Sequence, residues 1–142
     1  MISRALDYAL RSCLYMASRS EKEIHSVKEI SDALGVSQSY LGKILQKLVH
    51  KNYLKSITGP TGGFALAQPT NKITIHDLML AIDGMKGFEM CVLGVSICDE
   101  LNPCPVHDTW KQCKDKMLKA FETTSIEEAS RSPWPGTDWV RP

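Results

Sequence analysis

The sequence predicts a mainly α-helical protein with one small β-hairpin and a long helix towards its C-terminal end. Apolar residues recur at steps of three and four over Ile2–Ser18, Ser37–Lys51 and the stretch after Pro105, which is the period of an amphipathic helix. Two strand-like runs, Tyr53–Ile57 and Phe64–Ala67, flank a glycine-rich turn. With 142 residues, 43% of them hydrophobic, the chain can form one ordinary core and an appended arm.

A helix-turn-helix is expected after the first helix. Ser26 is placed to cap a short helix that ends at Gly35, and Glu29 would complete a capping box with it. Ser37 then caps a longer helix that runs to about Lys51. Two helices of these lengths, joined by a tight turn, have the size and shape of a helix-turn-helix.

The hairpin that follows is expected to be a wing. Its turn, Thr58–Gly63, contains three glycines, which allow a positive φ at a hairpin tip and a close approach of the backbone to another surface. A further helix over Ile75–Gly84 completes a winged helix-turn-helix DNA-binding domain, which we place at residues 1–84.

The formal net charge of +1 hides an asymmetry along the chain. No Asp or Glu occurs between Ala33 and His76, whereas five lysines do. This window therefore carries +5, and the remaining 12 basic and 16 acidic residues sum to −4. A local cationic surface on a near-neutral protein is typical of binding to phosphates, so the window predicts nucleic acid as a partner.

The expected contacts to double-stranded DNA come from the first turn of the second helix, from the lysines beside it and from the turn of the wing. In a helix-turn-helix the first turn of the second helix faces base edges, and lysines beside it meet phosphates. The glycine turn of the wing supplies the third of these contacts. The candidate DNA-binding residues are Ser37, Gln38, Ser39, Tyr40, Lys43, Lys47, Gly59, Thr61 and Gly62.

Three of the five cysteines lie within fourteen residues, as Cys91-x6-Cys98-x5-Cys104, and His107 follows after two more residues. In a reducing cytosol such a group is a ligand set rather than a disulfide frame, and thiolates with imidazole hold thiophilic metals or iron–sulfur clusters. The spacing does not match the closely paired ligands of common zinc fingers, which favours a cluster over zinc. We place this cluster-binding loop at residues 85–104.

A last long helix should begin near Pro105, because proline suits the first turn of a helix. A winged helix of ~80 residues already has a complete core, so the large apolar stripe of this helix is expected to meet a second copy in a homodimer. Residues 105–131 are expected to form this dimerisation helix and a short following helix, and residues 132–142 an irregular tail. The stripe consists of Val106, Trp110, Met117 and Phe121.

Other classes of protein are disfavoured. No apolar run approaches the ~20 residues that cross a bilayer, and the first residues lack the apolar segment of a signal peptide. No phosphate-binding loop, acid pair in an apolar setting or nucleophile with a base suggests an enzyme. We therefore expect a cytoplasmic protein that is not an enzyme and has no membrane partner.

The chain resembles the Rrf2 family of bacterial transcription regulators over about residues 1–131. The resemblance implies a homodimeric winged-helix DNA binder, and in many members an iron–sulfur cluster held by three cysteines controls the affinity for promoters. The motifs that carry it are Leu6–Arg11 in the first helix, Gly35–Leu41 opening the recognition helix, Gly59–Gly63 in the wing, and Cys91, Cys98 and Cys104–His107.

Two branches of the family differ in the fourth cluster ligand that they imply. The iron–sulfur-biogenesis branch holds a [2Fe–2S] cluster with a histidine two residues beyond the third cysteine, and His107 matches that place. The nitric-oxide-sensing branch holds a [4Fe–4S] cluster with an aspartate from the first helix of the partner chain, and Asp7 matches that place. We favour His107 and [2Fe–2S], because the proximity of His107 to Cys104 needs no partner chain; [4Fe–4S] stays possible.

The expected function is therefore a dimeric transcriptional repressor whose promoter affinity is controlled by a cluster that senses iron–sulfur status, redox state or nitric oxide. Two alternatives stay open: a member of the same family without a cluster, which senses thiol oxidation or protein contact, and a protein with a structural Cys3His zinc site. The remaining cysteines, Cys13 and Cys113, are expected to be structural, since a buried free cysteine behaves as a small hydrophobe.

Overall fold

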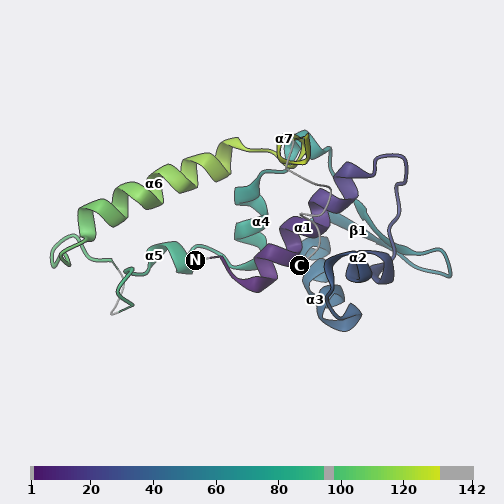
Figure 1. Ribbon diagram of the computed structural model, residues 1–142, viewed down its shortest axis with the longest axis horizontal. Helices are drawn as coiled ribbons and strands as arrows, with labels where there is room; N and C mark the ends of the chain where they lie inside the picture. Colours follow the sequence, from purple (N-terminus) through teal and green to yellow (C-terminus); the bar gives the residue numbers. More distant parts are fainter. Residues whose placement is uncertain (1, 95–97, 132–142) are drawn as a thin grey trace.

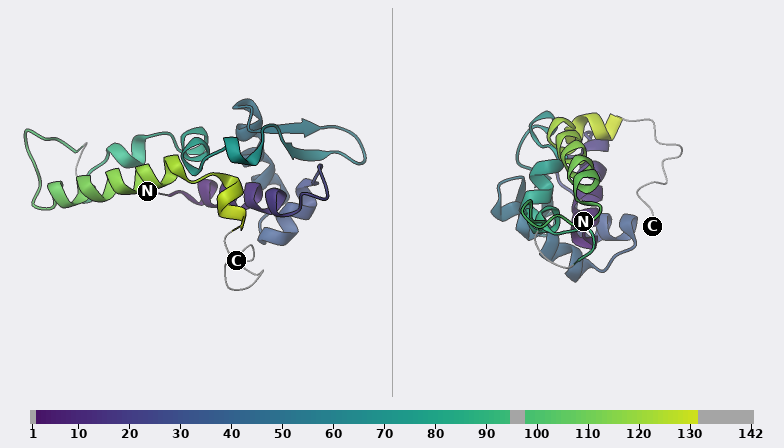
Figure 2. Two further views of the ribbon diagram at one scale, coloured as in Figure 1. Left: turned by 90° about the horizontal axis from the view of Figure 1, so that it is seen from above. Right: turned by 90° about the vertical axis from the view of Figure 1, so that its left-hand side faces the viewer.

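The computed structural model describes residues 2–94 and 98–131, so the expected tail at 132–142 lies outside the described residues. The elements in chain order are α1 Arg4–Ser18, α2 Val27–Leu34, α3 Gln38–His50, β1 Leu54–Ile57, β2 Gly63–Leu66, the 3-10 turn η1 Thr70–Lys72, α4 Ile75–Ile82, α5 Lys86–Glu89, α6 His107–Thr123 and α7 Ile126–Arg131. They form an elongated molecule, in which a helical body carries the hairpin at one end and an arm of α5 and α6 at the other (Figure 1, Figure 2). Among the described residues, no helix is long and apolar enough to cross a membrane.

The expected helix-turn-helix is confirmed by α2 and α3. Ser26 and Ser37 cap these helices, and each side chain accepts a hydrogen bond from the backbone N–H three residues further on. Gly35 ends α2 in the left-handed conformation, with φ of 66°, where a side chain would be strained. The first helix begins at Arg4 rather than at Ile2, because Ser3 caps it.

The capping box expected at Ser26 and Glu29 is only half formed, so that part of the prediction is wrong. The Glu29 carboxylate instead accepts hydrogen bonds from Tyr15 Oη at 3.2 Å, from His25 Nδ1 at 2.9 Å and from Lys22 Nζ. A complete capping box occurs at the start of α4, between Thr74 and Asp77. The Glu29 side chain therefore connects α2 to α1 and to the α1–α2 turn, because its three hydrogen-bond donors belong to those segments.

The Glu29 network predicts a loss of stability in acid. Burial opposes ionisation, but hydrogen bonds from Lys22 and His25 outweigh it and lower the pKa of Glu29 from 4.5 to about 2. A carboxyl whose pKa is lowered by folding contributes stability that is present above its unfolded pKa and lost as the pH falls towards its folded pKa.

We expect the free energy of unfolding to fall by on the order of 2 kcal/mol more in the wild type than in Glu29→Gln as the pH drops from about 5 to about 2, allowing for partial solvent screening. Urea unfolding across this range measures the difference. Parallel losses in the two proteins would assign acid sensitivity to other groups.

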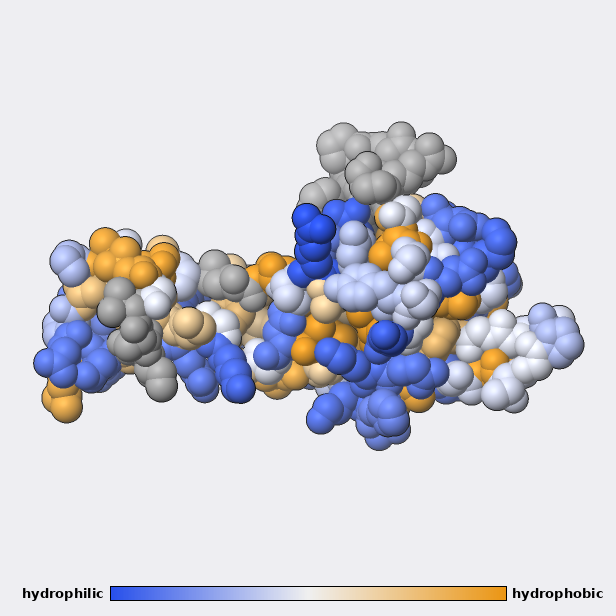
Figure 3. Space-filling model, turned by 90° about the horizontal axis from the view of Figure 1, so that it is seen from below, coloured by the Kyte–Doolittle hydropathy of each residue, from blue (hydrophilic) through white to orange (hydrophobic). Residues whose placement is uncertain are grey.

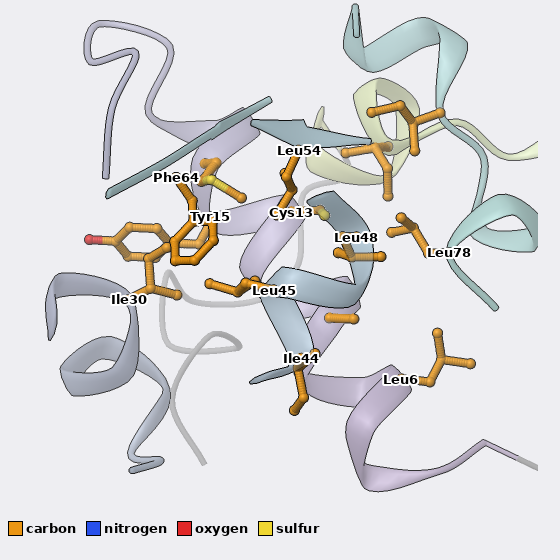
Figure 4. Close-up of a cluster of buried hydrophobic side chains, with 14 of the residues drawn as sticks. Leu6, Cys13, Tyr15, Ile30, Ile44, Leu45, Leu48, Leu54, Phe64 and Leu78 are labelled. Atoms are coloured by element: carbon orange, nitrogen blue, oxygen red, sulfur yellow. The ribbon is translucent and has the colours of Figure 1, made fainter. Parts of the chain in front are cut away.

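One hydrophobic core joins α1, α3, α4 and the base of the hairpin (Figure 4). Its side chains recur at helical spacing on the inward faces, as expected for α3, where Leu41, Ile44, Leu45 and Leu48 are buried. Each fully buried leucine contributes about 1.5–3 kcal/mol relative to exposure. Cys13 lies in this core with no exposed surface, as expected, and burial raises the pKa of its thiol to about 12.

The hairpin is confirmed as an antiparallel pair, with Leu54 opposite Leu66 and Ser56 opposite Phe64. A third segment extends it, because His25 exchanges two backbone hydrogen bonds with Phe64, at 2.9 and 2.8 Å. The wing is thereby attached directly to the turn that precedes α2.

The arm contains an element that the aperiodic sequence did not indicate, the short helix α5, whose Phe88 is buried. The long helix α6 begins at His107, two residues after Pro105, close to the expected place. After α6 the chain returns to the body, where the Ile126 N–H donates to the Ile73 carbonyl at 2.8 Å. Both ends of the arm are therefore tied to the core.

Candidate functional site

The first turn of α3 lies at the surface, as a recognition helix requires. Gln38, Ser39 and Tyr40 are exposed, and the Ser37 hydroxyl accepts from the Tyr40 N–H at 3.3 Å. The Tyr40 ring also meets the Tyr8 ring of α1 edge to face, with centroids 6.0 Å apart. Gln38 and Ser39 are thus the most accessible side chains for base edges, and Tyr40 is partly held by α1.

The expected lysine flank is present along α3. Lys43, Lys47 and Lys51 are exposed, at fourfold spacing outside the stripe of buried residues. Among the ion pairs of the described residues, none involves Lys43 or Lys47. Lys55 differs, because its Nζ pairs with Glu23 at 2.7 Å, an acid from outside the acid-free window. The charge available to phosphates is therefore concentrated on α3.

The glycines of the wing turn have the geometry expected of a tight tip. Gly59 has φ of 107°, and a Cβ added at Gly62 would lie 2.2 Å from the Ile57 carbonyl oxygen. Gly59 and Thr61 are exposed at the end of the hairpin. This tip projects from the body on the side away from the arm, which leaves it free to contact DNA (Figure 1).

The cysteine loop brings its candidate ligands together as two pairs. Cys91 Sγ lies 3.7 Å from Cys104 Sγ, and Cys98 Sγ lies 3.3 Å from His107 Nδ1. The cysteines are half-buried and His107 is buried. The Cys98 N–H donates to the Glu89 carbonyl at 3.0 Å, so the backbone of Cys98 is fixed to the end of α5. Its partner His107 is the first residue of α6.

The Cys91–Cys104 pair has the separation expected of two ligands on one metal atom. Two thiolates on one tetrahedral metal, each at about 2.3 Å, lie about 3.8 Å apart, close to the separation of Cys91 and Cys104. Within residues 2–94 and 98–131, no three His, Cys, Asp or Glu side chains converge on a position for one ion. A closed Cys3His zinc site is therefore not preformed among these residues, and thiolates with an imidazole are donors that an iron–sulfur cluster also accepts.

A cavity of about 200 Å³ opens beside Cys98 and His107. Lys111 and Lys114 line it, one turn and two turns beyond His107 on α6; Lys114 Nζ donates to the Phe88 carbonyl at 2.8 Å and Lys111 pairs with Glu100. Sequence analysis missed both lysines, although their spacing from His107 places all three on one helical face.

The other candidate ligand, Asp7, lies in the first turn of α1. Its carboxylate pairs with Arg11 Nε at 2.9 Å and is 43% exposed, which leaves it accessible to a second chain. Cys113, expected to be a structural cysteine of the late helix, is exposed instead. The partly buried side of α6 runs through Trp110, Lys114, Met117 and Phe121, and Cys113 lies outside it.

The four residues of the expected dimer stripe differ in their surroundings. Met117 and Phe121 pack in part against the core of their own chain, and Phe121 meets Phe88 edge to face with centroids 6.4 Å apart. Trp110 Nε1 donates to the Met90 carbonyl at 3.3 Å, and Val106 is 41% exposed. Figure 3 shows hydrophobic side chains gathered at the outer end of the arm. The large exposed ones are Met90, Val92, Leu93, Leu101 and Val106.

Comparison with known proteins agrees with this architecture. Residues 2–131 match the Rrf2 family model, described as an iron-dependent transcriptional regulator. A protein of Aquifex aeolicus (strain VF5) that carries the name of an HTH-type transcriptional regulator is 32% identical over 130 residues, which cover 90% of each chain.

Two solved structures share the fold. CymR (YrzC), the global cysteine regulator of B. subtilis, superposes with a TM-score of 0.75 at 22% identity, covering 92% of this chain and 95% of CymR. T. potens IscR superposes with a TM-score of 0.71 at 18% identity, covering 91% of this chain and 85% of IscR. The predicted fold class, mainly α with a small β-wing and a winged helix-turn-helix, is confirmed.

Proposed function

This chain belongs to the Rrf2 family of transcriptional regulators, and on that premise we propose that it is a homodimeric repressor of promoter DNA whose affinity is controlled by an iron–sulfur cluster. As a regulator of this family it is not an enzyme. The observation that carries the proposal is the position of the two ligand pairs. They lie in the arm, where the chain passes from α5 to α6.

The residues that would hold the cluster are Cys91, Cys98, Cys104 and His107, with Asp7 of a partner chain as the alternative to His107. When bound, an iron–sulfur cluster supplies a centre that reacts with oxidants and nitric oxide. The four side chains connect the end of α5 to the start of α6, because Cys91 and Cys98 follow α5, Cys104 precedes α6 and His107 is its first residue. [2Fe–2S] is favoured by the two-pair arrangement.

Dimerisation through α6 is supported by the exposed apolar end of the arm. Exposed apolar side chains gathered at one end of a molecule are typical of an interaction site. A dimer presents two α3 helices, which must lie about one turn of DNA apart, ~34 Å, to read two half-sites. Loss of the cluster would free α5 from α6 and change that separation, with a coupling energy of about 1–3 kcal/mol between cluster and DNA binding.

DNA binding is tested on the free lysines of α3, with an operator selected from random DNA. Lys43→Ala and Lys47→Ala should weaken binding to operator and unrelated DNA alike, and each should reduce the slope of log affinity against log salt by about one, because one phosphate contact is lost. Gln38→Ala should relax sequence preference at one base pair, at a cost of about 1–3 kcal/mol.

Lys119→Ala, on the exposed surface of α6, is the matched control and should bind as the wild type does. Fluorescence anisotropy at several salt concentrations measures all four variants. If every α3 variant kept the affinity, salt slope and specificity of the wild type, the helix-turn-helix would not be the DNA-binding surface.

A second candidate function, thiol sensing without a cluster, is favoured by one observation, the 3.7 Å between Cys91 Sγ and Cys104 Sγ. A small approach would let these thiols form a disulfide, giving two protons and two electrons to an oxidant such as a peroxide. Iron-free protein that loses these two thiols on mild oxidation, and changes its DNA affinity with them, would support this function over a cluster.

A further inference from the structure

The side chain of His25 is buried in the turn between α1 and α2, far along the chain from the cysteine arm. Its Nδ1 lies 2.9 Å from Glu29 Oε1 and its Nε2 lies 3.0 Å from the Lys22 carbonyl oxygen. A backbone carbonyl only accepts hydrogen bonds, and the Glu29 carboxylate, which also forms an ion pair with Lys22, accepts as well. Both ring nitrogens therefore face acceptors, and both must carry a proton.

The backbone of His25 is at the same time part of the wing. Its N–H donates to the Phe64 carbonyl and its carbonyl accepts from the Phe64 N–H, at 2.9 and 2.8 Å. The contact is close, since a Cβ added at Gly63 would lie 2.2 Å from the His25 carbonyl oxygen. The Tyr15 ring packs edge to face on the imidazole, with ring centroids 5.7 Å apart. Any shift of His25 must move the wing strand at Phe64.

We propose that His25 is held as a buried imidazolium that positions the wing for DNA, so that operator affinity falls when the ring loses a proton. The part that concerns DNA rests on the proposed function. Loss of either proton turns a nitrogen lone pair towards an oxygen acceptor, and a buried hydrogen bond becomes a repulsive contact. The segment Lys22–Ser26 then relaxes, and the Phe64 end of the wing follows it.

Several titratable and charged groups lie around His25. Glu29 and Lys22 pair with each other, Arg19 lies 3.7 Å above the Tyr15 ring, and on the wing side Lys55 pairs with Glu23. Among these residue types, histidine is the one whose ordinary change of charge falls near neutral pH. We therefore take the imidazole as the group whose loss of a proton would move the wing. The titratable and charged groups facing this site are Tyr15, Arg19, Lys22, Glu23, Glu29 and Lys55.

The first test uses the free protein and needs no DNA. Nitrogen NMR of 15N-histidine-labelled protein should show both His25 ring nitrogens protonated at about pH 7. As the ring is deprotonated, hydrogen exchange of the Phe64 amide should accelerate on the order of tenfold relative to the Ala67 amide. The Ala67 amide donates to the Tyr53 carbonyl at 3.0 Å at the other end of the hairpin, so it is the internal control. A singly protonated ring at about pH 7 would overturn the proposal.

The second test measures operator binding from about pH 6 to about pH 9. Wild-type affinity should fall on the order of tenfold, the effect of one good DNA contact, in step with the loss of the imidazolium signal. His25→Gln can donate one hydrogen bond but carries no charge, so it should bind weakly and independently of pH. His76→Gln, in the first turn of α4 and partly exposed, should follow the wild type.

Wild-type affinity that stays constant while the ring titrates would overturn the role in DNA binding. The wild-type series decides this even if His25→Gln fails to fold. If no protein binds DNA at any pH, the proposed function fails, and the exchange of the Phe64 amide then decides alone whether His25 positions the wing.

Discussion

Anaerobically purified Cys98→Ala will be colourless, whereas the wild type will be brown or red with visible absorption from its cluster. Cys98 is half-buried, is bonded through its backbone to α5, and forms a pair with His107. Without its thiolate, the ligand set keeps only the Cys91–Cys104 pair and a lone imidazole, which cannot complete tetrahedral sites on two iron atoms. Operator affinity should change with the loss of iron by about 5- to 150-fold.

Cys113→Ala is the matched control for this loss, because it also removes a thiol, but from the exposed side of α6. It should keep the wild-type spectrum and iron content. If Cys98→Ala assembled a normal cluster, the proposed sensor would be refuted. A colourless wild type that holds zinc or no metal would refute it as well.

The fourth ligand is decided by two further variants in the same experiment. His107→Ala should alter the iron spectrum in Mössbauer or EPR spectroscopy, because His107 Nδ1 already lies beside Cys98. Asp7→Ala should leave that spectrum unchanged if His107 is the ligand. The opposite result would assign the ligand to Asp7 of the partner chain and favour [4Fe–4S].

Trp110→Glu will convert the dimer to monomers and abolish binding to an operator with two half-sites. Burial of an aromatic side chain contributes about 1.5–3 kcal/mol per subunit, so its loss from both subunits should raise the dimer dissociation constant by on the order of 10²–10⁴. Trp110 is preferred over Phe121 for this test, because Phe121 also packs against its own core. Sedimentation velocity at micromolar concentration measures the change.

Gln112→Glu is the control for the added charge. Gln112 lies two positions further along α6, about 200° around the helix from Trp110, and it is exposed. It should remain dimeric and bind the operator. Circular dichroism of both variants checks that the helices are intact. A monomeric wild type, or a dimeric Trp110→Glu, would contradict dimerisation through this stripe.

The sequence by itself determined the winged helix-turn-helix. Ser26, Ser37 and Gly35 decide where helices start and stop because capping acts within one turn of the chain. The glycines of the wing turn act locally in the same way, since only their own φ and nearest backbone matter. Periodicity identified the buried leucines of α3, because any helix of that sequence exposes the same stripe to a core.

Only the tertiary structure decided which partners meet across the chain. The Glu29 side chain does not complete the capping box and accepts hydrogen bonds from Tyr15, Lys22 and His25 instead, because folding places these three donors beside it. The cysteines, evenly spaced in sequence, separate into two pairs because α5 and α6 place them from opposite sides. Cys113 is exposed because α6 leans on the body along a slightly different stripe from the one that its sequence suggested. Each of these outcomes depends on long-range packing, which local sequence patterns do not record.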